Sequence, residues 1–378
     1  MADQKRMANY ELLRILAMVM VVILHFLSQS DRLVSLDHPL EGVRILGTLM
    51  EFFCLAAVNV YVFLSGYFGV KSSFKPGKAV SLLCQIWFYA LLIPIALAAS
   101  GMPIVAIKGG KLNLYGLVQY LFPIETEHYW FATSYLMLYL LSPVLNTAVR
   151  NMSKKQLQIT LGGLLLLFCV IKSISPISFV TDRYGYDLSW FICVYLVAAY
   201  FGKYGSCFFE KNGWMTYILS CLAGFCIHMV MWFVCQRWDG FAYYFTVPFH
   251  YNFIFCLTAA IGLFYGFSKI QIKEGVWARL IRKMGGLSFG IYLLHEHIDL
   301  RNLWYGWISG AVNPGKAQGL GAFVWELVCS VVMIFAAGIL IDWMRSKLFS
   351  VVACRLGRRK PGRKLKELAE AFETVDLK

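Results

Sequence analysis

The sequence predicts an all-α polytopic membrane protein with about ten transmembrane helices and both termini in the cytoplasm. Composition is the first observation behind this prediction, since 59% of the 378 residues are hydrophobic and only 15% are charged. A soluble domain is typically about a quarter charged. The mean hydropathy of +0.62 agrees. The other two observations are the recurrence of long apolar segments and the placement of the positive charges between them.

Apolar segments of roughly the 20 residues needed to cross a bilayer recur along the chain. The segment 112–124 is too short to cross, and we expect it to lie along the interface or to re-enter. The expected spans are 10–29, 45–69, 79–100, 129–149, 157–175, 188–204, 214–235, 250–268, 286–308 and 320–344.

The larger share of the 35 Lys and Arg residues falls at alternate ends of these spans. Cytoplasmic loops of membrane proteins carry such an excess, so these ends and both termini are predicted to be cytoplasmic. This pattern also explains the net charge of +14 without nucleic acid as a partner. We expect one transmembrane domain, residues 8–345, followed by a tail, residues 346–378. The tail is basic and then acidic, with a short amphipathic helix (KLKELAEAF), and is expected to contact anionic lipid.

The 11 cysteines predict neither a disulfide framework nor a metal site. Most of them lie inside apolar segments, none forms a CxxC motif, and no Cys/His pair has zinc-finger spacing. We interpret them as packing residues.

Ionisable residues inside the spans are candidate functional groups, because a charge in the bilayer is costly. The first span contains Arg14 and His25, whose separation of eleven residues puts them on one helical face, about 16 Å apart. Arg14 has an alternative role as an anchor that reaches the inner surface. For His25, the alternative is a histidine whose hydrogen bonds are satisfied by a neighbouring helix.

The second span adds Glu51 at a depth compatible with His25. A carboxylate beside an imidazole orients it and raises its pKa, which favours a general base. If the span is shifted by one turn, Glu51 instead lies among the lipid headgroups. Ser65 and Gly66, near the other end of this span, permit close approach between helices or to a ligand.

The ninth span carries many polar groups, and Tyr292 and His295 are the candidates among them for binding a substrate. So many polar groups indicate a water-filled cavity that opens outward. His295 and His297 do not predict a metal site, because positions i and i+2 of a helix point to different faces. At the start of the fourth span, Trp130 is either part of an interfacial aromatic belt or a platform for a sugar.

Several motifs, in their order and spacing, resemble the acyltransferase-3 family of integral-membrane acyltransferases. Arg14 and His25 form an Arg-x10-His pair, and the resemblance extends over residues 8–345. The other motifs are FLSGYF in the second span, YWF followed by YLLSPVLN in the fourth, and LSFGIYLLH in the ninth.

The resemblance implies transfer of an acyl group, usually acetyl, from cytoplasmic acyl-CoA to a hydroxyl of a carbohydrate at or beyond the outer face of a bacterial cytoplasmic membrane. The arginine and histidine of the family's first span correspond to Arg14 and His25. Some members carry a fused SGNH-type esterase domain, and this chain is expected to act alone or with a separate extracytoplasmic partner. No tightly bound cofactor is implied, and a homo-oligomer is possible.

A mechanism follows as an expectation from these residues. Arg14, Lys71, Lys75 and Lys78 would bind the phosphates of acetyl-CoA, since Arg and Lys recognise phosphate. The pantetheine arm would then run along the first helix to His25. There His25 would act as general base on the acceptor hydroxyl or carry the acetyl group itself. Tyr292 and His295 would hold the thioester carbonyl or the sugar.

Two other functions remain possible from the sequence. A transporter or flippase of a polysaccharide precursor suits the helices and buried charges, although the paired, broken-helix repeats typical of transporters are not evident. A membrane sensor or scaffold would use the basic tail to contact a cytoplasmic partner.

Overall fold

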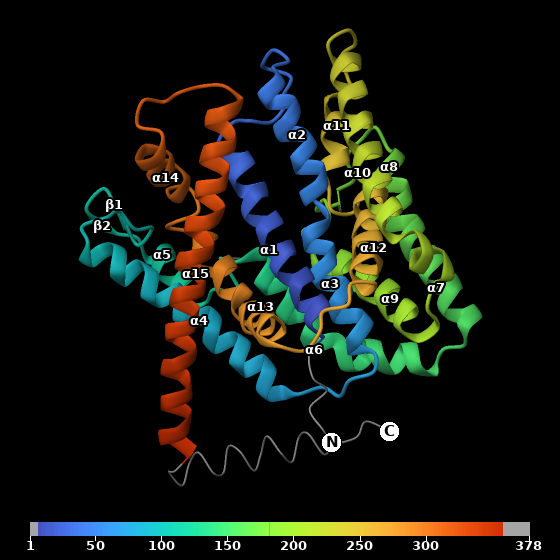
Figure 1. Ribbon diagram of the computed structural model, residues 1–378, viewed down its shortest axis with the longest axis horizontal. Helices are drawn as coiled ribbons and strands as arrows, with labels where there is room; N and C mark the ends of the chain where they lie inside the picture. The colour runs from blue at the N-terminus through green and yellow to red at the C-terminus, as the bar shows by residue number, and fades with distance from the viewer. Residues whose placement is uncertain (1–6, 127, 181, 358–378) are drawn as a thin grey trace.

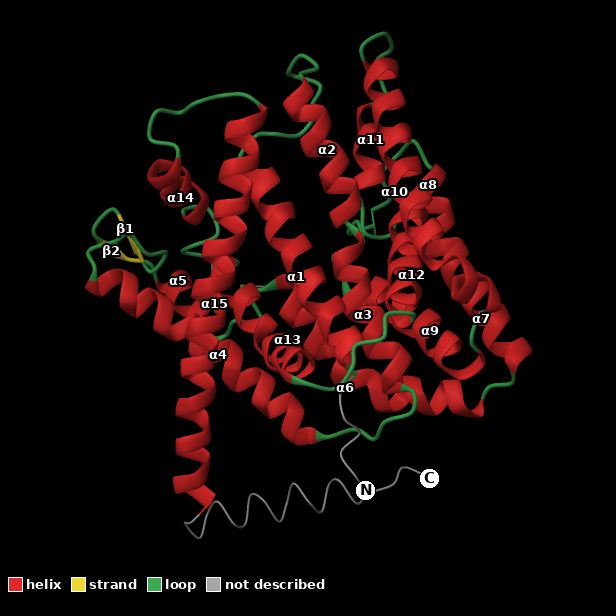
Figure 2. Cartoon of the chain, in the orientation of Figure 1, coloured by secondary structure: helices red, strands yellow, loops and turns green. Residues whose placement is uncertain are grey.

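The computed structural model describes residues 7–126, 128–180 and 182–357, and this part of the chain is almost entirely helical (Figures 1 and 2). A two-stranded antiparallel hairpin, β1 (Ile107–Lys108) and β2 (Lys111–Leu112), is the exception among the described residues. The helices are α1 (Ala8–Gln29), α2 (Gly42–Cys54), α3 (Ala56–Gly69), α4 (Pro76–Ala99), α5 (Leu114–Leu121), α6 (Trp130–Asn151), α7 (Lys154–Leu165), α8 (Ile171–Ile174), α9 (Leu188–Tyr204), α10 (Cys207–Cys235), α11 (Ala242–Thr246), α12 (Ile254–Ser268), α13 (Val276–His295), α14 (Trp304–Val312) and α15 (Leu320–Gly357). A π-helical turn, η1 (Leu166–Val170), joins α7 to α8, and a 3-10 turn, η2 (Val247–Phe249), follows α11.

The predicted class, an all-α polytopic membrane protein, is confirmed. By length and composition, eight helical stretches of the described chain are able to cross a membrane, and α9 is a shorter apolar helix. The eight stretches are Ala8–Gln29, Gly42–Gly69, Pro76–Ala99, Trp130–Asn151, Lys154–Ile174, Cys207–Cys235, Ala242–Ser268 and Leu320–Ala353. The number of crossings and the side on which the termini lie stay predictions.

The ninth predicted span, 286–308, is not one helix. Helix α13 ends at His295, a segment of turns follows, and a separate helix α14 begins at Trp304. The physical reason is that polar groups after His295 bond outside the helix. The Asp299 carboxylate, for example, accepts a hydrogen bond from the backbone of Val105, which offers the chain an alternative to helical pairing. His297 lies beyond the end of α13, so the helical i, i+2 spacing that was expected to keep His295 and His297 from sharing a metal does not hold there.

Two further segments differ in detail from their predicted extents. The short segment expected at 112–124 forms the eight-residue helix α5, whose Leu114, Tyr115 and Leu121 side chains are exposed. Helix α15 continues past residue 345 to Gly357. The rest of the predicted tail, including its amphipathic helix, lies outside the described residues.

Helix α1 lies inside the bundle and packs against α2, α3, α12, α13 and α15 (Figure 1). Close helix crossings around it depend on glycine. A Cβ atom at Gly66 of α3 would collide with the backbone carbonyl of Tyr195 in α9, so this glycine serves contact between helices. Helix α1 is held between α3 on one side and α13 on the other. This placement brings side chains of α1 and α13 together at the candidate site.

Candidate functional site

The packing of α1 on α13 brings two histidines together. His25 lies one turn from the end of α1, and His295 is the last residue of α13. The Nδ1 atom of His25 is 2.9 Å from the Nε2 atom of His295, a hydrogen bond between residues 270 positions apart in the sequence. Two residues predicted from separate spans therefore belong to one site.

The hydrogen bonds of the pair determine which nitrogen atoms carry protons. The Nδ1 atom of His295 lies 2.6 Å from the carbonyl oxygen of Ile291, which can only accept, so His295 Nδ1–H donates. In the neutral imidazole, His295 Nε2 then accepts the proton of His25 Nδ1–H. The Nε2 atom of His25 is left with a free lone pair, which is the form that a general base requires.

A carboxylate completes this arrangement. Glu296 Oε1 lies 3.4 Å from His25 Nε2, and the Glu296 side chain is only 10% exposed. Glu296 follows the last helical residue of α13, and its backbone N–H closes the helix on the carbonyl of Tyr292. When His25 gains a proton, this carboxylate is in position to stabilise the imidazolium charge.

His25 faces a largely apolar cavity inside the bundle. The His25 side chain keeps 26% of its surface exposed, and it shares the cavity with Tyr61 and Tyr292. The hydroxyl of Tyr292 is buried and has no hydrogen-bond partner among the described residues. The other lining residues are Met18, Val21, Leu24, Val58, Trp130, Phe131 and Tyr251.

Trp130, the first residue of α6, lies in an aromatic cluster at this cavity. Its ring centroid is 4.5 Å from that of Tyr186 and 5.9 Å from that of Tyr251, and the rings of Trp130 and Tyr251 stack at 19°. Flat aromatic faces of this kind suit the apolar face of a sugar ring. The structure thus brings Trp130, Tyr292 and His295 to the site of His25.

Glu51 is buried in α2, but the structure does not pair it with His25. The hydrogen bond and the ion pair found for His25 join it to His295 and Glu296. Glu51 instead interacts electrostatically with Tyr186 and Tyr251 of the aromatic cluster. Its Oε2 atom has no hydrogen-bond partner among the described residues. Among the described residues, Glu51 is thus a buried carboxylate with one unpartnered oxygen atom, and its role stays a prediction.

Arg14 lies on the same uninterrupted helix as His25, one turn after Glu11, with which it forms a hydrogen-bonded ion pair. The Glu11 side chain is almost fully buried, whereas that of Arg14 is 30% exposed. Gly285 of α13 faces Glu11, because a Cβ there would collide with the carboxylate. The hydroxyl of Tyr61 also donates to the backbone carbonyl of Arg14 over 2.7 Å.

Lys71, Lys75 and Lys78 lie in and next to the connection from α3 to α4, at the end of the bundle where α1 begins (Figure 1). The Tyr139 hydroxyl fixes this connection, accepting from the backbone N–H of Lys75 at 3.2 Å and donating to its carbonyl at 3.0 Å. The lysines and Arg14 thus occupy the same half of the molecule, away from His25.

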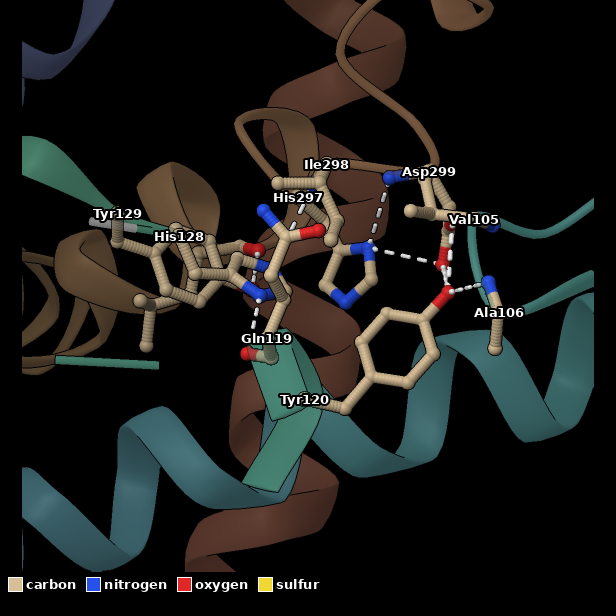
Figure 3. A network of polar contacts seen from close by, with 10 residues as sticks. Val105, Ala106, Gln119, Tyr120, His128, Tyr129, His297, Ile298 and Asp299 are labelled. Carbon is tan, nitrogen blue, oxygen red and sulfur yellow. Dashed lines mark hydrogen bonds and ion pairs between the residues drawn. The ribbon is translucent and has the colours of Figure 1, made fainter. Parts of the chain in front are cut away.

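A second polar network holds the segment after α13 (Figure 3). Asp299 is its centre: the carboxylate accepts from the backbone N–H of Val105 at 2.7 Å and from the Tyr120 hydroxyl at 2.7 Å. His297 and His128 lie beside it, with ring centroids 4.5 Å apart. The network ties the turn that carries Glu296 to α5 and to the hairpin region.

Sequence reasoning missed several of these groups. Glu296 is one of the polar residues of the ninth predicted span, and its position next to His295 is the only signal of a role. Tyr61, Tyr186 and Tyr251 carry no signal, because tyrosines are common in apolar segments. Glu11 could have been found as a carboxylate one helical turn before Arg14.

A helical membrane protein in which a histidine pair lies next to a carboxylate and faces an internal cavity has the features of a membrane-embedded enzyme. The comparisons with known proteins agree. The sequence profile of the acyltransferase-3 family, described as an acyltransferase domain, matches residues 7–343, and the chain belongs to this family. The protein is therefore a membrane acyltransferase. Searches of curated proteins and of solved structures returned no match to the chain.

Proposed function

We propose that this acyltransferase moves an acetyl group from acetyl-CoA to a hydroxyl of a cell-surface or exported carbohydrate, within a bacterial cytoplasmic membrane. The observation that carries the proposal is the hydrogen-bonded pair of His25 and His295. His25 faces the internal cavity and lies on the same helix as Arg14. Family membership supports the acyl transfer. The donor, the acetyl group and the acceptor are the proposed parts.

In the proposed reaction, the acceptor hydroxyl lies against His25 Nε2, whose lone pair is kept free by the hydrogen bond to His295. The hydroxyl oxygen attacks the thioester carbonyl as His25 takes its proton. The carbon–sulfur bond then breaks, an ester forms, and His25 returns the proton to the CoA thiolate. Glu296, 3.4 Å from His25 Nε2, stabilises the imidazolium between these steps.

The donor path follows α1. The helix is continuous from Ala8 to Gln29, so Arg14 and His25 are held about 16 Å apart along its axis. This separation is comparable with the length of a pantetheine arm. Arg14, with Lys71, Lys75 and Lys78 at the same end of the bundle, would bind the CoA phosphates.

The acceptor is proposed to lie on the aromatic cluster of Trp130, Tyr186 and Tyr251. Stacked rings contact the apolar face of a sugar, and the unpartnered Glu51 Oε2 supplies an acceptor for a sugar hydroxyl. The unpartnered hydroxyl of Tyr292, in the same cavity as His25, would donate to the thioester carbonyl.

The test is the substitution His25→Ala in the full-length protein. We expect acyl transfer to fall by about 10²–10⁴-fold, because a general base contributes roughly this much, while the protein still inserts and elutes as a folded species. Activity is measured as thiol release from acetyl-CoA by detergent-purified protein. Mass spectrometry of surface glycans from cells with and without the gene identifies the acyl group and the acceptor.

The matched control is His38→Gln, which changes an exposed histidine in the α1–α2 connection. It should retain normal activity. Full activity of His25→Ala would exclude His25 as the general base. Movement of a polysaccharide precursor without any acyl transfer would instead favour a transporter.

A further inference from the structure

Three side chains that can ligate a metal converge at the end of α13. One ligand atom each from His25, His295 and Glu296 lies within 4.8 Å of the others. We propose that these residues form a binding site for a zinc-class divalent cation, and that the bound cation inhibits acyl transfer. The inhibitory part rests on the proposed function, because it assumes that His25 is the base.

The ligand types match the metal. Two histidines and one glutamate are the protein ligands of a known kind of zinc site, with bonds of about 2.0–2.2 Å. Tetrahedral geometry then puts ligand atoms roughly 3.3–3.5 Å apart. With His25 Nε2 as the ligand atom, Glu296 Oε1 lies at this spacing, 3.4 Å away, and the ligand atoms of all three residues lie within 4.8 Å of one another. Binding of the ion requires the hydrogen bond between His25 Nδ1 and His295 Nε2 to break, so that His295 Nε2 turns from His25 to the metal.

The surroundings of His295 are those of a metal ligand. A ligating histidine almost always donates its other ring N–H to a carbonyl or carboxylate, which fixes the ring and its tautomer. His295 Nδ1–H donates to the Ile291 carbonyl over 2.6 Å, so the lone pair of His295 lies on Nε2, where it accepts His25 Nδ1–H when no metal is bound. The contact with Ile291 exists within α13 itself and does not depend on a metal.

The fourth coordination position would be open. His25 lines the internal cavity, so a water molecule or a substrate hydroxyl can reach a cation held by the three residues. A cation at this place uses the lone pair of His25 that the reaction needs. Since a coordinated nitrogen cannot accept a proton, occupancy by zinc and general-base catalysis exclude each other.

The experiment is equilibrium dialysis of the full-length, detergent-purified protein against zinc in metal-free buffer, with elemental analysis of the bound metal. We expect the wild type to bind one zinc ion. The variants His295→Ala and Glu296→Gln should bind zinc at least roughly tenfold more weakly than the wild type does. The control His38→Gln should bind zinc as the wild type does. Thiol release from acetyl-CoA should fall in proportion to occupancy.

Zinc binding that is equal in the wild type, His295→Ala and Glu296→Gln would overturn the site. Unchanged or increased thiol release at full occupancy would overturn the inhibition. The dialysis measures metal directly, so a protein that binds zinc through these residues but never transfers acyl groups would refute the proposed function and leave the metal site standing.

Discussion

Arg14 and Glu11 form an ion pair one helical turn apart on α1, with the carboxylate almost fully buried. Arginine near the end of a membrane helix often reaches toward the headgroups as an anchor. Here the guanidinium instead turns to a buried carboxylate, and α13 makes room for that carboxylate with Gly285. This fixed position suits a guanidinium that recognises phosphate.

We predict that Arg14→Ala raises the KM for acetyl-CoA about tenfold or more, because a charge-assisted hydrogen bond contributes roughly 1.5–3 kcal/mol. The kcat of the folded protein should change less, since Arg14 lies far from His25. Steady-state thiol release at varied acetyl-CoA concentration measures both constants.

Arg44→Ala is the matched control, because it removes an arginine from an ion pair with Asp31 in the α1–α2 region. Its KM should match that of the wild type. If Arg14→Ala lowers the yield of inserted protein but leaves KM unchanged in the remaining fraction, Arg14 is only an anchor.

At the scale of elements, the end of α13 decides the geometry of the site. The helix stops at His295, and the following turn is held by Asp299, whose partners come from the chain around residue 105 and from α5. Glu296 lies between the helix end and this fixed turn. The turn therefore positions Glu296 next to His25.

We predict that Asp299→Ala destabilises the protein and lowers kcat more than it raises the KM for acetyl-CoA. The substitution leaves the Val105 N–H and the Tyr120 hydroxyl without their acceptor, at a cost of roughly 1–3 kcal/mol for each buried group. Thermal unfolding in detergent and steady-state kinetics measure the two effects.

Tyr120→Phe removes one donor while keeping the acceptor, so it should show a smaller loss of both stability and kcat. Asp239→Ala, at an exposed loop position, is the control and should change neither. A normal kcat in a folded Asp299→Ala protein would show that the turn held by Asp299 does not contribute to catalysis.

Hydropathy predicts most helices of this chain well, because a bilayer-spanning segment needs a long apolar run whatever its neighbours are. Its failure at 286–308 has a physical cause. The break depends on hydrogen bonds that Asp299 accepts from Val105 and Tyr120, which are distant in the sequence. Local polarity shows that the segment is unusual, but it does not show where the polar groups find their partners.

The candidate site was predictable only in part for the same reason. The buried position and the shared helix of Arg14 and His25 follow from periodicity within one span. The contact between His25 and His295 needs the packing of α1 on α13, and the pairing of His25 with Glu296 depends on where α13 ends. No pattern within a single segment contains this information.

Across the whole molecule, the connection from α3 to α4 and the last turns of α15 lie at the end where α1 begins, whereas the α10–α11 connection lies at the opposite end (Figure 1). The sequence predicts that the first of these ends is cytoplasmic, because its loops are rich in Lys and Arg.

We predict that a membrane-impermeant maleimide labels Asp239→Cys in intact cells, but labels Ser72→Cys only after the membrane is permeabilised. Asp239 lies in the α10–α11 connection and Ser72 in the α3–α4 connection. The unmodified chain, whose Cys207 and Cys226 are exposed, gives the background. The reverse pattern of labelling would place the basic end outside the cell.

The hydrogen bond between His25 and His295 also has a consequence for biosynthesis. The two residues are separated by 270 positions. At a synthesis rate of about 5–20 residues per second, roughly 14–54 seconds pass between the addition of the first histidine and that of the second. During this interval, His25 lacks the neighbour that selects its tautomer. A nascent chain therefore carries an unfinished site, which becomes complete only when α13 joins the bundle near the end of translation.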